Sequence, residues 1–140
     1  MKKIVLVLIA LSIVWVSCNN TTTSTDSTSS SAATENGAAI AFEKNNFDFG
    51  KVAAGAKVTH EFKFKNTGNA PLIISNAQAS CGCTVPEYPK EPVAPGESGV
   101  IRVVFDSAGR QGMQNKIVSV TSNATPSLTE IYLTGEVTAK

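Results

Sequence analysis

The stretch Val58–Phe64, V-T-H-E-F-K-F, decides the fold class of this chain. Polar residues alternate in it with apolar or aromatic ones, which are Val58, His60, Phe62 and Phe64. Successive side chains of a β-strand point to opposite faces, so this alternation predicts a half-buried strand. Because the other face carries only polar groups, the strand is typical of an antiparallel sheet with one side in water.

Segments on both sides of this stretch also predict strands. None of them has apolar residues at helical spacing over three turns. About seven strands with turns roughly every 8–12 residues predict an all-β, immunoglobulin-like antiparallel β-sandwich. A barrel is the alternative, and the small core favours the sandwich. The further predicted strands are Ile40–Phe42, Phe47–Val52, Leu72–Ile74, Val100–Phe105, Ile117–Val120 and Ile131–Val137.

Glycine and proline mark the turns between these strands. Gly50, Gly55 and Gly68 stand where the chain must turn, and glycine tolerates a positive φ. The pair Pro95-Gly96 is typical of a type II turn. The stretch Thr84–Gly96 holds several prolines, which lack the N–H of a ladder donor. We expect it to form a loop or a ragged edge strand that protects a sheet edge.

The chain begins with the pattern of a secretory signal. Lys2 and Lys3 precede the apolar run Ile4–Val16, which is shorter than the ~20 residues needed to span a bilayer. The following Ser17-Cys18 resembles the lipobox of bacterial lipoproteins. That resemblance implies cleavage before Cys18 and acylation of its thiol; the alternative is an ordinary signal peptide with an incidental cysteine.

A polar segment follows the predicted lipidation site. Between Thr21 and Thr34, 11 of 14 residues are Ser or Thr, too polar to offset the entropy of ordering. We therefore divide the chain into a signal peptide (1–17), a lipidated Cys18 with a disordered tether (18–39), and a sandwich domain (40–140). Some surface-exported lipoproteins carry acidic residues directly after the cysteine, whereas Asn19 follows it here. We expect an outer-membrane lipoprotein of the cell envelope that faces the periplasm.

Composition excludes several function classes. The formal net charge of +1 argues against nucleic-acid binding, and the single histidine leaves little room for a catalytic triad. His60 is best interpreted as a rim or core residue that makes a local hydrogen bond. Carbohydrate binding is a weaker idea, because most phenylalanines lie on predicted inward faces. We predict no enzyme activity and no cofactor.

The motif Cys81-Gly82-Cys83 is the one chemically suggestive feature of the domain. In an extended strand the two Cα atoms would lie about 6.5–7 Å apart, at the upper edge of disulfide geometry, and Gly82 permits a bend that shortens the gap. Three other interpretations stay open: a two-coordinate Cu(I) site, a catalytic thiol pair, and an inert pair of small buried side chains. Zinc is excluded by ligand count.

Several motifs in order carry a family resemblance. They are Phe47–Gly50, Phe64–Gly68 with Pro71-Leu72, Ser80–Thr84, Pro95–Gly99, Thr121–Asn123 and Leu133–Gly135. The set resembles the bacterial family called domain of unknown function 1573, over roughly Phe42 to Val137, and is similar to Hydin-type and major-sperm-protein-type immunoglobulin-like domains. The resemblance implies an immunoglobulin-like sandwich in secreted or lipid-anchored envelope proteins, and no established activity.

These observations together predict a lipid-anchored, non-enzymatic scaffold or protein-interaction module. Its partners would be the membrane, through the anchor, and an envelope protein. The alternative function is a copper-binding or thiol-redox accessory protein that uses Cys81 and Cys83.

Overall fold

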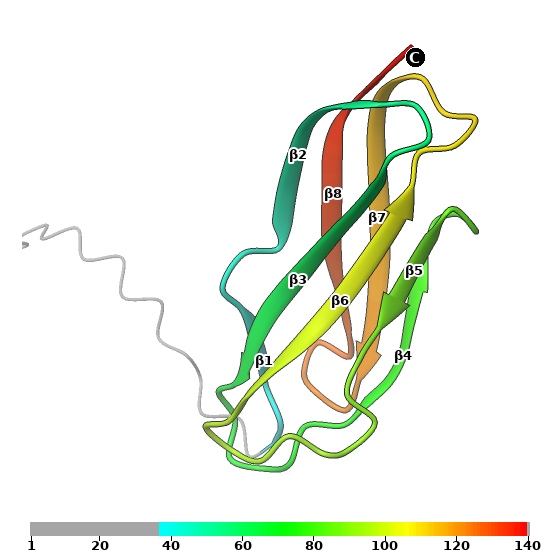
Figure 1. The fold of residues 1–140 in the computed structure, drawn as a ribbon. Coiled ribbons are helices and arrows are strands. Elements are labelled where there is room, and N and C mark those ends of the chain that lie inside the picture. The colour runs from blue at the N-terminus through cyan, green and yellow to red at the C-terminus, as the bar shows by residue number, and fades with distance from the viewer. Residues whose placement is uncertain (1–36, 140) are drawn as a thin grey trace, which may run out of the picture. The chain divides into compact units, whose positions relative to one another are not determined.

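The computed structural model describes residues 37–139, which form two four-stranded β-sheets (Figure 1). The first sheet has the strand order β1-β3-β6-β5 and the second the order β2-β8-β7-β4. This part of the chain holds no helix that could cross a membrane. The strands are β1 (Ile40–Phe42), β2 (Asn46–Ala53), β3 (Lys57–Asn66), β4 (Ile74–Ala79), β5 (Thr84–Glu87), β6 (Ser98–Asp106), β7 (Gly112–Ser122) and β8 (Leu128–Thr138).

The predicted all-β sandwich is confirmed, with three differences in detail. There are eight strands rather than about seven, because Thr84–Glu87 pairs with β6 as an edge strand, which is one of the two alternatives expected for the proline-rich stretch. The strand predicted at Leu72–Ile74 begins only at Ile74 and runs to Ala79. Leu72 makes an isolated bridge to Val93 instead.

The third difference is that one strand pair is parallel. The chain leaves the first sheet after Phe42 and joins the second at Asn46, where β2 runs parallel to β8 and places Phe47 beside Leu133. All other pairs of neighbouring strands are antiparallel. This change of sheet sets which strand edges remain uncovered.

The core lies between the two sheets and is built from the alternating side chains of their strands. Phe62 and Phe64 of β3 are each 1% exposed, as the alternation of Val58–Phe64 predicts. Val58 and His60 of the same face are only half-buried, because β1 does not extend that far along β3. The other fully buried apolar side chains are Leu72, Ile101, Val103, Phe105, Val118, Val120, Ile131, Leu133 and Val137.

A buried asparagine holds the loops at one end of the sandwich. The side-chain amide of Asn66 donates to the carbonyl oxygens of Ala70 (2.8 Å) and Val93 (2.9 Å). Its Oδ1 accepts from the N–H groups of Gly68 (3.0 Å) and Ala39 (3.4 Å). A buried amide with all these partners orders three separate segments at once.

Gly68 is needed for a different reason from the one predicted. Gly50, Gly55 and Gly96 do have positive φ values of 67°, 91° and 80°. Gly68 is not among the glycines with positive φ. A Cβ atom there would instead overlap the carbonyl oxygen of Gly37, so the glycine permits close approach of two backbone segments.

Candidate functional site: the disulfide turn between the sheets

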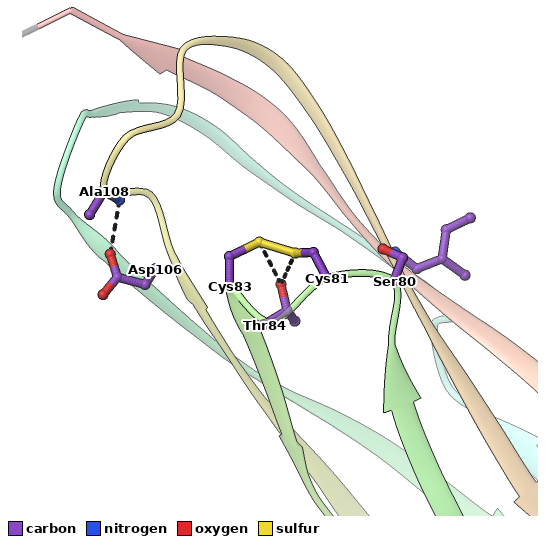
Figure 2. Close-up of a disulfide and its surroundings, with 7 residues drawn as sticks. Ser80, Cys81, Cys83, Thr84, Asp106 and Ala108 are labelled. Carbon is purple, nitrogen blue, oxygen red and sulfur yellow. Dashed lines mark hydrogen bonds between the residues drawn. A yellow bond between two sulfur atoms is a disulfide. The ribbon is translucent and has the colours of Figure 1, made fainter.

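The Cys-Gly-Cys motif forms a turn that carries the chain from one sheet to the other. It follows β4, an edge strand of the second sheet, and precedes β5, an edge strand of the first. The N–H of Thr84 donates to the carbonyl of Cys81 at 3.2 Å, which closes the turn. Cys81 and Cys83 are joined by a disulfide, with Cα atoms 5.3 Å apart (Figure 2). The turn thus replaces the extended spacing expected from a strand and brings the two residues within the usual disulfide range.

Both ends of this turn are fixed to neighbouring strands. The N–H of Ser80 donates to the carbonyl of Ile117 in β7, and the Ser80 hydroxyl accepts from the Ile117 N–H at 3.2 Å. At the other end, the N–H of Asp106 in β6 donates to the carbonyl of Cys83 at 2.9 Å. The turn is therefore a bonded link between the two sheets.

The disulfide is partly covered and has one polar neighbour. The hydroxyl oxygen of Thr84, a residue only 4% exposed, lies 3.7 Å from the sulfur of Cys81 and 3.8 Å from that of Cys83 (Figure 2). Ser80 and Thr84 were named from the sequence only as the ends of longer segments, with no role of their own. Their one signal was their place on either side of the Cys-Gly-Cys motif.

The oxidised pair limits the chemistry of this site. Thiolate, not disulfide, is the nucleophile and the soft-metal ligand, so the pair as it stands offers no ligand to Cu(I). Within residues 37–139 no three side chains of His, Cys, Asp or Glu gather into a metal-binding group. Reduction would be the first step of any thiol or metal chemistry here.

The edge strand that leaves the turn presents almost no hydrogen-bond donors. The carbonyl of Cys83 bonds to β6, and hydrogen-bond direction alternates along an antiparallel strand, so the backbone N–H and C=O groups of Val85 and Glu87 also point toward β6. The backbone groups of Thr84 and Pro86 therefore point toward the outer edge. The N–H of Thr84 is used in the turn, and Pro86 has none. The outer edge of β5 therefore offers carbonyl oxygens but no free N–H within the strand, which protects it from pairing.

His60, the other candidate from the sequence, lies at a different place, on β3. Its ring stacks on Phe47, with centroids 3.7 Å apart and planes 5° apart, and meets Phe62 edge to face. Burial lowers the pKa of His60 from its usual value. It contacts aromatic rings rather than the hydrogen-bond partner expected. A shallow depression of about 230 Å³ beside it is lined by Glu43, Lys44, His60, Glu61, Phe62 and Lys63.

Cys18, the predicted lipidation site, lies outside the described residues, as do the predicted signal peptide and nearly all of the predicted tether. The described chain starts at Gly37, whose carbonyl accepts from the N–H of Asn69. Ala38 forms a bridge to Ala124 and is 7% exposed. Residues 37–39 therefore contact the sandwich directly.

Comparison with solved structures shows the same fold. A crystal structure of a protein of unknown function from Porphyromonas gingivalis W83 matches with a TM-score of 0.63 and 18% identity, covering 71% of this chain and 47% of that one. The ASH/PapD-like domain 7 of human CEP192 matches with a TM-score of 0.62 and 7% identity, covering 76% and 89%. The YadV chaperone matches with a TM-score of 0.51 and 14% identity, covering 70% and 51%.

The chain spans about half the length of the Porphyromonas protein. No curated protein matches it. At the sequence level, the model of a family described as "Protein of unknown function (DUF1573)" matches residues 40–137, which is nearly the whole of the described sandwich. Sequence motifs and an immunoglobulin-like, PapD-like fold therefore agree, and the chain belongs to the DUF1573 family.

Proposed function

We propose that this protein is a lipid-anchored, non-enzymatic interaction module of the cell envelope. Cys18 would carry the lipid at the periplasmic side of the outer membrane, and the sandwich would contact an envelope protein. The family assignment and the immunoglobulin-like fold support this proposal, since such folds present edges and loops to partners. One structure of the same fold is a chaperone, a class of protein that acts by contacting other proteins.

One observation carries the proposal: the sandwich has a proximal and a distal end. Residues 37–39 are held at one end by Asn66 and by the Ala38–Ala124 bridge. The disulfide turn lies at the other end of β4, a six-residue strand, and so about 20 Å away (Figure 1). A lipid attached at Cys18 would precede the proximal end along the chain, and the turn lies at the opposite end of the sandwich.

The polar groups inside the sandwich support an interaction module rather than an enzyme. Asn66 orders loops, and the hydroxyl of Ser107 donates to the carbonyl of Ala56 at 2.7 Å. His60 stacks on an aromatic ring. Each of these groups already has a structural use, which distinguishes them from the free, convergent groups of a catalytic pocket.

Crosslinking in intact cells, followed by mass spectrometry, tests the interaction. We expect one envelope protein to be crosslinked repeatedly to exposed lysines of the sandwich, and the crosslinks to weaken when Cys18→Ala releases the protein from the membrane. Metabolic labelling with palmitate should mark the native chain and not Cys18→Ala. Labelling that persists in that variant would contradict the anchor, and an absence of specific crosslinks would contradict the module.

A thiol-redox accessory role is the second candidate, and the disulfide in a half-exposed turn is the observation that favours it. The test is to trap thiols in living cells with an alkylating reagent and to use Cys81→Ser/Cys83→Ser as the control. A substantial reduced fraction that changes with cell redox state supports this role. A copper titration of the reduced protein, lost in the same double variant, would support metal binding. A pair that stays fully oxidised excludes both.

A further inference from the structure

Half of β3 has an uncovered edge because β1 is short. The last contact on that side is the N–H of Glu43, which donates to the carbonyl of Lys63 at 3.0 Å. The chain then crosses to the second sheet, where β2 pairs with β8. In the described part of the chain no strand lies beside residues 57–61 on this edge. Figure 1 shows β3 continuing beyond the short β1 as the outermost strand of its sheet.

The backbone alternation of β3 identifies the groups on this edge. Even-numbered residues bond to β6: the carbonyl of Ala56 accepts from Ser107, and the N–H of Asn66 donates to Glu97. The odd-numbered Lys63 bonds to the β1 side. Because hydrogen-bond direction alternates along an antiparallel strand, the N–H and C=O groups of odd residues face the edge. At the uncovered part these residues are Lys57, Thr59 and Glu61.

This edge lacks the features that protect β5. The register of β3 with β6 runs without a bulge from Lys57 to Lys65, and no proline interrupts it. The side chains of Lys57, Thr59 and Glu61 are all exposed, and they point to the outer face of the sheet. A regular edge with unpaired donors and acceptors is the template on which another strand can be added.

The sequence of the edge is complementary to itself, and this selects its partner. If two copies pair antiparallel with Thr59 opposite Thr59, Lys57 of each copy stands opposite Glu61 of the other. Opposite charges and paired threonines are both favourable cross-strand neighbours, whereas like charges are unfavourable. On the inner side, Val58 would face His60 of the second copy, so the half-buried groups beside Phe47 become covered.

We propose that this protein pairs with a second copy of itself through residues 57–61 of β3, across a two-fold axis at Thr59. The proposal rests on the proposed interaction function and names one partner for it. The pairing is limited to this window, because Glu43 already bonds Lys63 and the chain before Lys57 turns toward the second sheet. Such a contact is self-complementary, as a two-fold interface requires. A shared membrane layer would raise the effective concentration of the copies.

Cysteine crosslinking of the full chain in native membranes tests the two-fold axis directly. Residues in a hydrogen-bonded antiparallel pair have Cα atoms about 5.5 Å apart, within disulfide reach. We therefore expect Thr59→Cys to form a crosslinked dimer rapidly on mild oxidation. Lys65→Cys is the matched control, because it is exposed on the same face of the same strand but its edge is covered by β1. Thr59→Cys that crosslinks no faster than Lys65→Cys would overturn the proposal.

Charge reversal in the Thr59→Cys background tests the register. Lys57→Glu or Glu61→Lys alone places like charges opposite each other twice, and should slow crosslinking about tenfold. The double variant restores both opposite-charge pairs and should restore the rate. If the double variant remains slow, the edge binds something other than a second copy and the proposal is wrong.

This result is separable from the test of the proposed function. Specific crosslinks to another envelope protein, without dimer formation by the Thr59→Cys variant, would leave the interaction module standing and remove the self-pairing. Loss of all specific crosslinks, both to envelope proteins and between copies of Thr59→Cys, would remove both.

Discussion

The ring of His60 lies flat against the ring of Phe47, with 3.7 Å between their centroids. Phe47 belongs to β2 of the second sheet and His60 to β3 of the first, so this contact joins the two sheets where the chain has just passed from one to the other. Stacked rings of this kind contribute to the packing between elements. The contact also ties the only histidine of the chain to the stability of the fold.

We expect stability to fall as the pH drops below about 6.5, partly because of His60. Burial lowers the pKa of His60 in the folded protein, so the unfolded chain takes up its proton first. The stabilising effect is complete above the unfolded pKa and decreases as the pH falls toward the folded one. His60→Phe keeps an aromatic ring and removes the titration. Urea unfolding at pH 7.5 and pH 5 should show a smaller pH effect in this variant; an identical effect would contradict the assignment.

Replacing a core phenylalanine should be costly. Phe62→Ala is expected to lower the free energy of unfolding by about 3–5 kcal/mol, because the ring is fully buried between the sheets. Val85→Ala is the control, since Val85 is 55% exposed on an edge strand and its loss should cost under about 0.5 kcal/mol. Chemical denaturation measures both. Equal losses in the two variants would be inconsistent with the assigned faces.

Asn66→Ala should destabilise the proximal end of the sandwich. The change removes the side-chain donor from the part-buried carbonyl of Ala70, and an unsatisfied group of this kind costs about 1–3 kcal/mol. The carbonyl of Val93 also loses this donor but keeps the N–H of Leu72. Amide hydrogen exchange should speed up at Gly68 and Ala39, whose N–H groups lose their acceptor. Asn115→Ala, at an exposed position of β7, is the control. Unchanged exchange at Gly68 would refute the role given to Asn66.

Removing the disulfide should cost little stability. The loop that it closes is very short, and for such a loop the chain-entropy relation gives about 1–2 kcal/mol. We expect Cys81→Ser/Cys83→Ser to remain folded, with a modest decrease in the denaturation midpoint and no effect of added reductant. The native protein should shift toward the variant when reductant is added. Unfolding of the double variant at room temperature would show that the turn holds the sheets together.

The first described residues should behave as part of the fold. Deleting residues 21–34 is expected to leave the melting temperature unchanged, because 11 of these 14 residues are Ser or Thr and can bury little apolar surface. Extending the deletion through Ala39 removes the buried Ala38 and the N–H that Asn66 accepts, and should lower it. Scanning calorimetry distinguishes the two deletions. A large drop in the shorter one would contradict this boundary.

The sequence predicted best where alternation is strong. The face of β3 could be read from V-T-H-E-F-K-F because large apolar and charged residues alternate there. The extent of β4 could not, because S-N-A-Q-A has no large apolar side chain. That strand exists because its backbone pairs with β7.

Features that depend on contacts between distant segments also could not be predicted from the sequence. The parallel pairing of β2 with β8 joins residues more than 80 positions apart, as Phe47 and Leu133 show. Asn66 stands in N-T-G-N, which reads as an ordinary turn, and only the fold buries it. For the candidate site, the Cys-Gly-Cys motif predicted which residues could carry disulfide, thiol or metal chemistry. It did not reveal that the turn connects two sheets, because the partners of Ser80 and Cys83 lie in β7 and β6.

Pro86 sets a limit on how far strand pairing could propagate. A sheet whose two outer edges both accept strands can add copies without end and grow into a filament. In the first sheet, the edge at β5 lacks donors, so only the β3 side remains competent. A molecule with one edge that can pair and one edge that cannot, in that sheet, stops associating at two copies. Pro86 contributes to this limit because its ring leaves no backbone N–H to donate.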